Sequence, residues 1–171
     1  MRQPLQPLKA GFTLIEILIG AAILIVLAGM AIPSFAEALE DAEVASLEQQ
    51  LQRIRTAIDY YTFQHEEQVP GYQTNPAGWS AAIFENQLLL ASDEDGNTAA
   101  VGTSGYYYGP YITEDFPRNP FNQLQTIHLV QPGTTFSEPD DTTGWVYWAD
   151  TGTLRANSSG STPDGIPLFE L

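Results

Sequence analysis

Glu16 is an ionisable side chain inside an otherwise apolar stretch of the chain. In this stretch, residues 12–32, Glu16 is the only charged residue and Thr13 the only other clearly polar one. A carboxylate among apolar groups is unfavourable unless a cation or hydrogen-bond donors stabilise it. The chemistry open to Glu16 is therefore pairing with a positive group, and an ionisable residue within a membrane span is by default a functional residue.

The apolar stretch has the length of a membrane-spanning helix. As an α-helix it would be about 31 Å long, close to the thickness of a bilayer core. We therefore expect a transmembrane helix at residues 12–33 rather than a buried helix of a soluble domain, because the stretch has no polar face. Arg2 and Lys9 precede the stretch and no basic residue follows until Arg53, which predicts a single pass with a cytoplasmic N-terminus.

A short basic leader, residues 1–11, precedes the apolar stretch and ends in Gly11. No clear small-residue cleavage site of a secretory signal follows the stretch. The sequence "KAGFTLIEILIGAAIL" resembles the N-terminus of type IV pilins and type II secretion pseudopilins. This resemblance implies that a prepilin peptidase cuts after Gly11 and that the new N-terminal residue, Phe12, is methylated on its amine.

The same resemblance implies a role for Glu16 in assembly. In that family the carboxylate at this position pairs with the N-terminal amine of a neighbouring subunit, and a charge-assisted pair is strong where water is excluded. The alternative is that Glu16 only reaches the cytoplasmic interface. The implied partners are other copies in a filament, other pseudopilins, the peptidase and an inner-membrane assembly platform, with the head in the periplasm.

Pro33 follows the apolar stretch and is predicted to kink the helix, because proline removes one backbone hydrogen bond. The alternative is that Pro33 ends the membrane helix. Residues 34–67 contain neither glycine nor a second proline and are expected to extend the helix to roughly 50 residues. Apolar residues at helical spacing predict one face that packs on a head; they are Leu47, Leu51, Ile54, Ile58 and Tyr61.

Charged residues gather on the other faces of this amphipathic segment. They either form a solvated surface or pair between subunits of a filament. The group comprises Glu37, Glu40, Asp41, Glu43, Glu48, Arg53 and Arg55.

Residues 68–171 are predicted to form a globular head of class α+β, in which a small antiparallel sheet packs on the long helix. Tyrosines of residues 106–122 should pack on the helix stripe. The expected elements are a loop at 69–79, a short helix at 80–92, a turn at 93–97, strands at 124–130 and 144–149, and a hairpin partner at 153–157.

The head also resembles a particular pilin-like type. "YGPYI…PRNPFN" and "GWVYWADTGTLRANSSG" are similar to heads of the major pseudopilin, type II secretion protein G. That resemblance implies calcium binding through acids of the C-terminal loop. The nearby acids, Asp140, Asp141, Asp150 and Asp164, do not reproduce the usual pattern, so calcium remains a possible cofactor without assigned ligands.

Composition excludes several functions. A net charge of −15 disfavours contact with nucleic-acid phosphates, and the lack of cysteine excludes disulfides and Cys–zinc sites. No nucleophile elbow, phosphate-binding loop or zinc-protease motif occurs. His65 and His128 lack metal-ligand spacing and are expected at the surface or in the sheet. We therefore expect no catalytic residues and no enzymatic activity.

Three functions remain for the whole chain. The first is a structural subunit of a type II secretion pseudopilus, whose helices pack into a periplasmic fibre that aids protein export. The alternative is a type IV pilin subunit of a surface filament used in adhesion, motility or DNA uptake. Many true pilins staple their C-terminal loop with a disulfide, which this chain cannot form. The third is a membrane-anchored receptor or enzyme that carries the same N-terminal segment.

Overall fold

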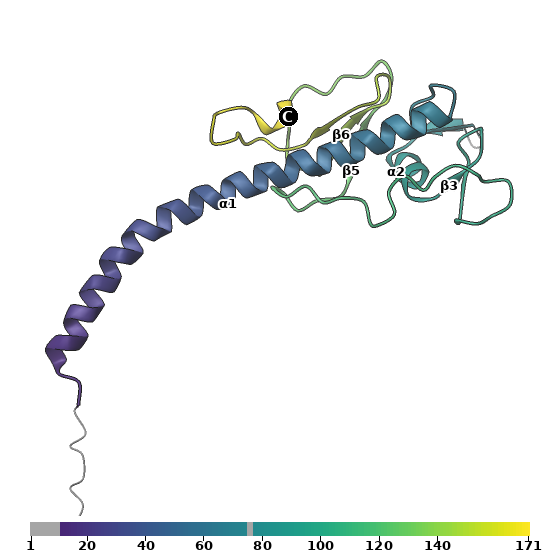
Figure 1. Cartoon of the computed structure of the whole chain (residues 1–171). Coiled ribbons are helices and arrows are strands. Elements are labelled where there is room, and N and C mark those ends of the chain that lie inside the picture. Colours follow the sequence, from purple (N-terminus) through teal and green to yellow (C-terminus); the bar gives the residue numbers. More distant parts are fainter. Residues whose placement is uncertain (1–10, 75–76) are drawn as a thin grey trace, which may run out of the picture. The chain divides into compact units, whose positions relative to one another are not determined.

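The computed structural model describes residues 11–74 and 77–171, without the side chains of residues 30–34, 36, 37 and 77. Arg2 and Lys9 of the predicted leader therefore lie outside the described residues. The chain divides into two units, residues 1–39 and 40–171. Figure 1 shows the elements along the chain.

Helix α1, Leu14–Gln64, contains 51 residues, which confirms the predicted long helix. Its bounds run through position 33, so the helix does not end at Pro33. The prediction that the helix reaches residue 67 is wrong by one turn. Glu66 and Glu67 have φ of 53° and 65°, and such left-handed residues end a helix. The amide of Glu67 donates to the carbonyl of Thr62 at 2.9 Å, which satisfies an otherwise free helix-end carbonyl.

The apolar stripe of α1 is the centre of the hydrophobic core. Its five residues, Leu47, Leu51, Ile54, Ile58 and Tyr61, are each at most 3% exposed, so the predicted packing face is confirmed. They belong to one cluster with Phe84 and Leu88 of helix α2, Ala81–Leu89, and with residues of the sheet. The predicted short helix is confirmed as well, and the hydroxyl of Ser80 caps it by accepting from the amide of Ala82 at 3.2 Å.

The main sheet has three strands in the order β5-β6-β7. Strands β5, Ile127–Val130, and β6, Trp145–Trp148, confirm the two predicted β-rich segments. Strand β7, Thr153–Ala156, pairs antiparallel with β6 as the expected hairpin partner. Trp145, Tyr147 and Leu154 of this hairpin are fully buried in the cluster that contains the α1 stripe.

Strands β5 and β6 pair in parallel, with Ile127 opposite Trp145 and Val130 opposite Trp148. This corrects the expectation that the whole sheet is antiparallel. Residues 131–144 connect the two strands, and a connection of this length can carry the chain back to the same end of the sheet. The head remains α+β, with antiparallel pairs elsewhere.

Two small antiparallel pairs complete the head. Strands β1, Tyr72–Thr74, and β2, Ala77–Trp79, form a hairpin where a loop was expected. Strands β3, Ala91–Ser92, and β4, Thr98–Ala99, flank the predicted turn at 93–97. The short 3-10 helix η1, Leu168–Glu170, anchors the C-terminal segment through buried Leu168.

Gln87 joins three segments of the head from inside. The side chain of this fully buried residue accepts from the amide of Gly71 at 2.7 Å. It donates to the carbonyls of Tyr72 at 2.7 Å and Gly96 at 2.8 Å. Because a buried amide is costly when unpaired, Gln87 fixes the β1 hairpin and the 93–97 turn on α2. The three-residue strands β1 and β2 follow from this tertiary contact rather than from local preference.

We predict that Gly96→Ala destabilises the head more than Gly102→Ala does. Both glycines have positive φ, 75° and 89°, but a Cβ at Gly96 would lie 2.6 Å from the Tyr61 hydroxyl, whereas nothing lies within 4 Å at Gly102. We expect the free energy of unfolding to fall by about 1 kcal/mol for Gly102→Ala and about 3 kcal/mol for Gly96→Ala. Urea unfolding of the full chain measures both, and equal losses would contradict the packing account.

Candidate functional site

Gly11, Phe12 and Thr13 precede α1 and are exposed. A Cβ at Gly11 would meet nothing within 4 Å, and the Phe12 side chain is 83% exposed. Helix α1 begins immediately after them, at Leu14. The predicted cleavage position thus lies in exposed backbone without regular secondary structure, next to a helix start.

Thr13 and Glu16 form a capping box at the start of α1. Glu16 Oε2 accepts from the Thr13 amide at 2.9 Å and from the Thr13 hydroxyl at 2.7 Å. The Glu16 amide donates to Thr13 Oγ1 at 3.3 Å. A Thr-x-x-Glu pattern before an apolar run is the known signature of this arrangement, and the sequence interpretation of Glu16 overlooked it. The carboxylate therefore has donors within its own chain.

The capping box leaves part of the Glu16 carboxylate free. Both bonds from Thr13 end on Oε2, and among the described residues Oε1 has no hydrogen-bond partner. The side chain is exposed, so a further donor can reach Oε1. The box thus orients the carboxylate without using all of its acceptor capacity.

Large apolar side chains surround this carboxylate on the first half of α1. Each residue of this apolar group is more than half exposed. The group includes Leu14, Ile15, Ile17, Leu18, Ile19, Ile23, Leu24, Ile25, Val26 and Leu27. An apolar surface of this size indicates contact with a protein or a membrane.

Among the helices that the structure describes, none has a segment long and apolar enough to cross a membrane. The predicted membrane span at residues 12–33 is therefore not confirmed. The predicted kink at Pro33 is also untested, because that side chain lies outside the described part of the chain.

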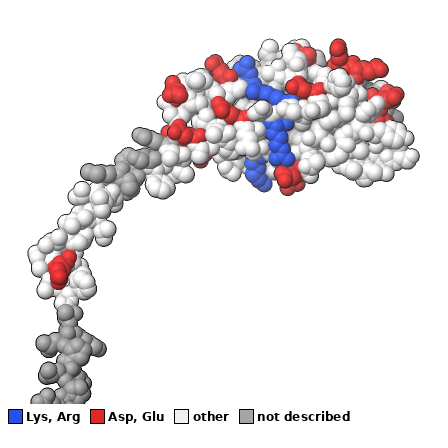
Figure 2. All heavy atoms as spheres, in the orientation of Figure 1, with Lys and Arg blue, Asp and Glu red and all other residues white. Residues whose placement is uncertain are grey.

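The charged surface of the head contains one ion pair among the described residues. Arg53 Nη2 lies 3.2 Å from Glu114 Oε2, within the chain. Figure 2 shows the arginines as a band across the head with acids on both sides. The exposed acids of α1 from Glu40 to Glu48 form no ion pair with a described residue, so the choice between a solvated face and pairing between subunits remains open. The side chain of Glu37 lies outside the described residues.

Both histidines were expected at the surface or in the sheet. His65 is instead buried beside the end of α1, whereas His128 is exposed on β5, in agreement with the expectation. The His65 ring stacks on Tyr61 at 3.9 Å, with Nδ1 2.9 Å from the Tyr61 carbonyl and Nε2 3.1 Å from Ser92 Oγ. A serine–histidine contact could suggest a nucleophile. Here Ser92 is fully buried and His65 is 2% exposed, so neither side chain is accessible from outside the protein. Their hydrogen bond instead holds the end of α1 against the β3–β4 turn.

The acids near the C-terminal loop bind donors of the chain. Asp140 Oδ1 accepts from Asn157 Nδ2 at 2.7 Å and from the Thr142 amide, and these bonds hold the pKa of Asp140 below its usual value. Asp141 accepts from the amide and hydroxyl of Ser159. Within the described ranges no three His, Cys, Asp or Glu residues are grouped to hold a metal ion.

Comparison with known protein families identifies the N-terminal segment. Residues 7–32 match the family described as the prokaryotic N-terminal methylation motif. No curated protein and no solved structure matches the chain. The matched segment contains Gly11, Phe12 and Glu16 and ends just before Pro33. This match supports a type IV pilin-like or pseudopilin-like protein. Proteins of this kind are in general structural; prepilin peptidase processes them, and they are anchored in a membrane and assembled into filaments.

We predict that Thr13→Val loosens the first turn of α1, whereas Thr13→Ser does not. Valine has the shape of threonine but lacks the hydroxyl, and loss of a capping residue costs about 0.5–2 kcal/mol of helix stability. Hydrogen exchange of residues 17–20 in the full chain should become several-fold faster in Thr13→Val. Equal exchange in both variants would show that the capping box contributes nothing to the helix start.

Proposed function

We propose that this protein is a structural subunit of a type II secretion pseudopilus. The observation that carries the proposal is the accessible Gly11–Phe12 bond directly before a capped helix that presents Glu16 among exposed apolar side chains. After cleavage at Gly11, Phe12 would carry a cationic amine, and methylation would keep that charge. The free Oε1 of Glu16 could then accept from the amine of a neighbouring copy.

The proposal places the protein in the inner membrane as a single-pass subunit, with residues 12–33 as the anchor and the head in the periplasm. The basic residues Arg2 and Lys9 before the apolar stretch support this orientation. Pro33 would loosen α1 between its apolar and amphipathic segments, because it cannot donate a backbone hydrogen bond. Burial of the apolar surface between copies would supply the cohesion of the fibre.

A type IV pilin subunit is the second candidate, since the methylation motif is common to both kinds of protein. The absence of cysteine favours the pseudopilin, because the C-terminal loop cannot be closed by a disulfide. Hydrogen bonds from Ser159 to Asp141 and from Asn157 to Asp140 fasten the corresponding segment here. Neighbouring genes would separate the two functions: a secretin cluster supports the pseudopilus, and a retraction ATPase supports the pilus.

We predict that the mature protein begins at methylated Phe12. Mass spectrometry of the N-terminal peptide from membranes measures this directly. Gly11→Val should leave the longer precursor in the membrane, since a side chain at that position would obstruct the peptidase, whereas Ala10→Val serves as a control next to the cut. A mature chain that retains Met1, or that starts at Ala31, would refute the family assignment.

We predict that Glu16→Ala and Glu16→Gln are both cut and inserted but do not assemble. Glutamine retains an oxygen that can accept from Thr13, and it serves in capping boxes, but it carries no charge to pair with an amine. Removing the carboxylate also makes insertion into lipid easier, by up to about 2.5–3.5 kcal/mol for an acid at the centre of a span. Membrane level and processing should therefore stay normal.

The readouts are precursor processing, membrane level and sheared fibres, each compared with the unaltered chain. If Glu16→Gln makes normal fibres, capping alone explains Glu16 and the pairing account is wrong. If either variant disappears from the membrane, Glu16 is needed for folding or insertion rather than for assembly.

A further inference from the structure

Two neighbouring hollows lie along one side of α1 in the head and share Tyr60 and Tyr111. We call their lining the tyrosine flank. Helix α1 forms one wall and the 107–111 loop the other. Besides the two shared residues, the lining consists of Gln49, Gln52, Arg53, Thr56, Ala57, Gln64, Tyr107, Gly109 and Pro110.

The tyrosine flank is electrically neutral in a strongly acidic chain. No carboxylate lines either hollow, although the net charge of the protein is −15. The one cation, Arg53, is paired with Glu114 at 3.2 Å. Burial raises the pKa of Tyr111 to about 12, and its hydroxyl donates to Gln64 Oε1 at 2.7 Å. In the part of α1 that belongs to the second unit, the acids lie outside these hollows, from Glu40 to Glu48 and at Asp59.

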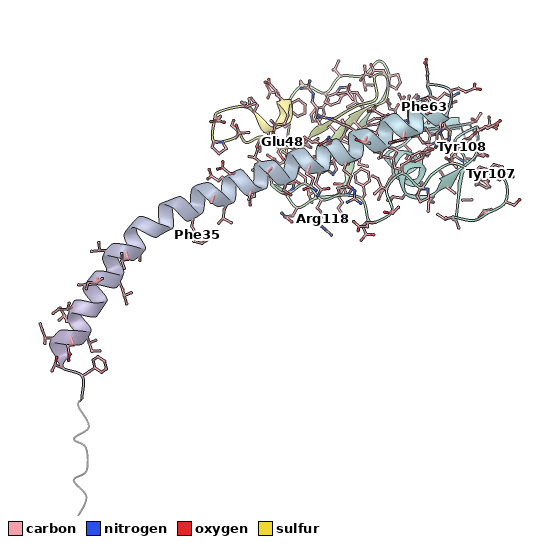
Figure 3. All side chains as sticks on the ribbon, viewed as in Figure 1. Phe35, Glu48, Phe63, Tyr107, Tyr108 and Arg118 are labelled. Atoms are coloured by element: carbon pink, nitrogen blue, oxygen red, sulfur yellow. The ribbon has the colours of Figure 1, made fainter. Side chains whose placement is uncertain are left out.

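Exposed aromatic rings stand on and beside this neutral surface. Tyr60 is 61% exposed and Tyr107 is 82% exposed. Phe63, one turn beyond Tyr60 on α1, is 83% exposed, and Figure 3 shows Phe63 on the helix and Tyr107 on the loop. Tyrosine, phenylalanine and arginine are enriched at the centres of protein interfaces, and acids are depleted there.

We propose that the tyrosine flank is a docking surface for a second copy of this chain. The inference rests on the proposed filament function and names the head surface used in it. Copies that each carry a net charge of −15 repel one another, so close approach is less unfavourable through a surface that no unpaired carboxylate lines. The flank is such a surface and lies on the same helix, α1, that begins at the capping box. In a filament the contact is head-to-tail, so the flank meets a different surface of the next copy.

Charge substitution tests the flank against matched controls. Thr56 is exposed and lines one hollow, so Thr56→Glu places a carboxylate in the flank without removing a core side chain. We expect sheared fibres to fall by about tenfold or more, because like charges across an interface are strongly unfavourable. Thr56→Gln, neutral and of similar size, should assemble normally. Val101→Glu adds the same charge to an exposed loop that lines neither hollow and should also assemble.

Membrane level and thermal unfolding should be unchanged in all three variants. Normal fibres from Thr56→Glu would overturn the proposal. An equal loss in Val101→Glu would overturn it too, since net charge rather than the flank would then control assembly.

Photo-crosslinking identifies the occupant. A benzophenone side chain replaces Tyr60 in the full-length chain in membranes, and in a control it replaces Val101. We expect a two-chain adduct from position 60 only, and its loss when Glu16→Ala is added. An adduct with another protein, or none in cells that make fibres, overturns the inference and leaves the proposed function intact. Absence of fibres from the unaltered chain, in cells where the secretion machinery is expressed, would instead reject both.

Discussion

The head depends on one face of α1 being buried. The three strands of the main sheet are four residues each, and a sheet this small is not stable without a partner that covers it. Leu47, Leu51, Ile54, Ile58 and Tyr61 provide that partner and are nearly inaccessible to water. Trp145 and Tyr147 of β6 belong to the same buried cluster. The head half of α1 is therefore part of the core of the domain, and its position is fixed by that packing.

This constraint divides the surface of α1 into parts with different physical roles. The stripe from Leu47 to Tyr61 is buried in the core of the head and is therefore not accessible to another molecule. The first half of the helix presents large apolar side chains that are exposed among the described residues, and the proposed function assigns their burial to neighbouring copies and the membrane. Glu16 lies in that half, where the Thr13 bonds hold its carboxylate in one orientation. A fixed carboxylate loses less conformational freedom on pairing than a mobile one.

The sequence predicts features that depend on local periodicity and turn chemistry. Examples are the α1 stripe, helix α2 and the β6–β7 hairpin. Two features were not predicted because they depend on contacts between distant parts of the chain. The parallel pairing of β5 with β6 depends on the 131–144 connection, and the β1–β2 hairpin depends on Gln87. His65 is buried because Ser92 and Asp93, at the β3–β4 turn, pack against the end of α1. The Thr13–Glu16 capping box follows a spacing that the sequence itself displays, but the sequence interpretation considered no partner for Glu16 within the chain.

The distribution of acids connects solubility with assembly. An excess of negative charge keeps separate copies apart, and a subunit that must associate needs surfaces from which this repulsion is absent. The apolar stretch at residues 12–33 contains a single acid, Glu16, and no acid lines the tyrosine flank, whereas the segment from Glu40 to Glu48 is rich in acids. In the proposed filament, neighbouring copies that match neutral surface with neutral surface would avoid placing these acids against one another. Charge placement would then restrict the arrangements of copies, while burial of apolar surface would supply the attraction.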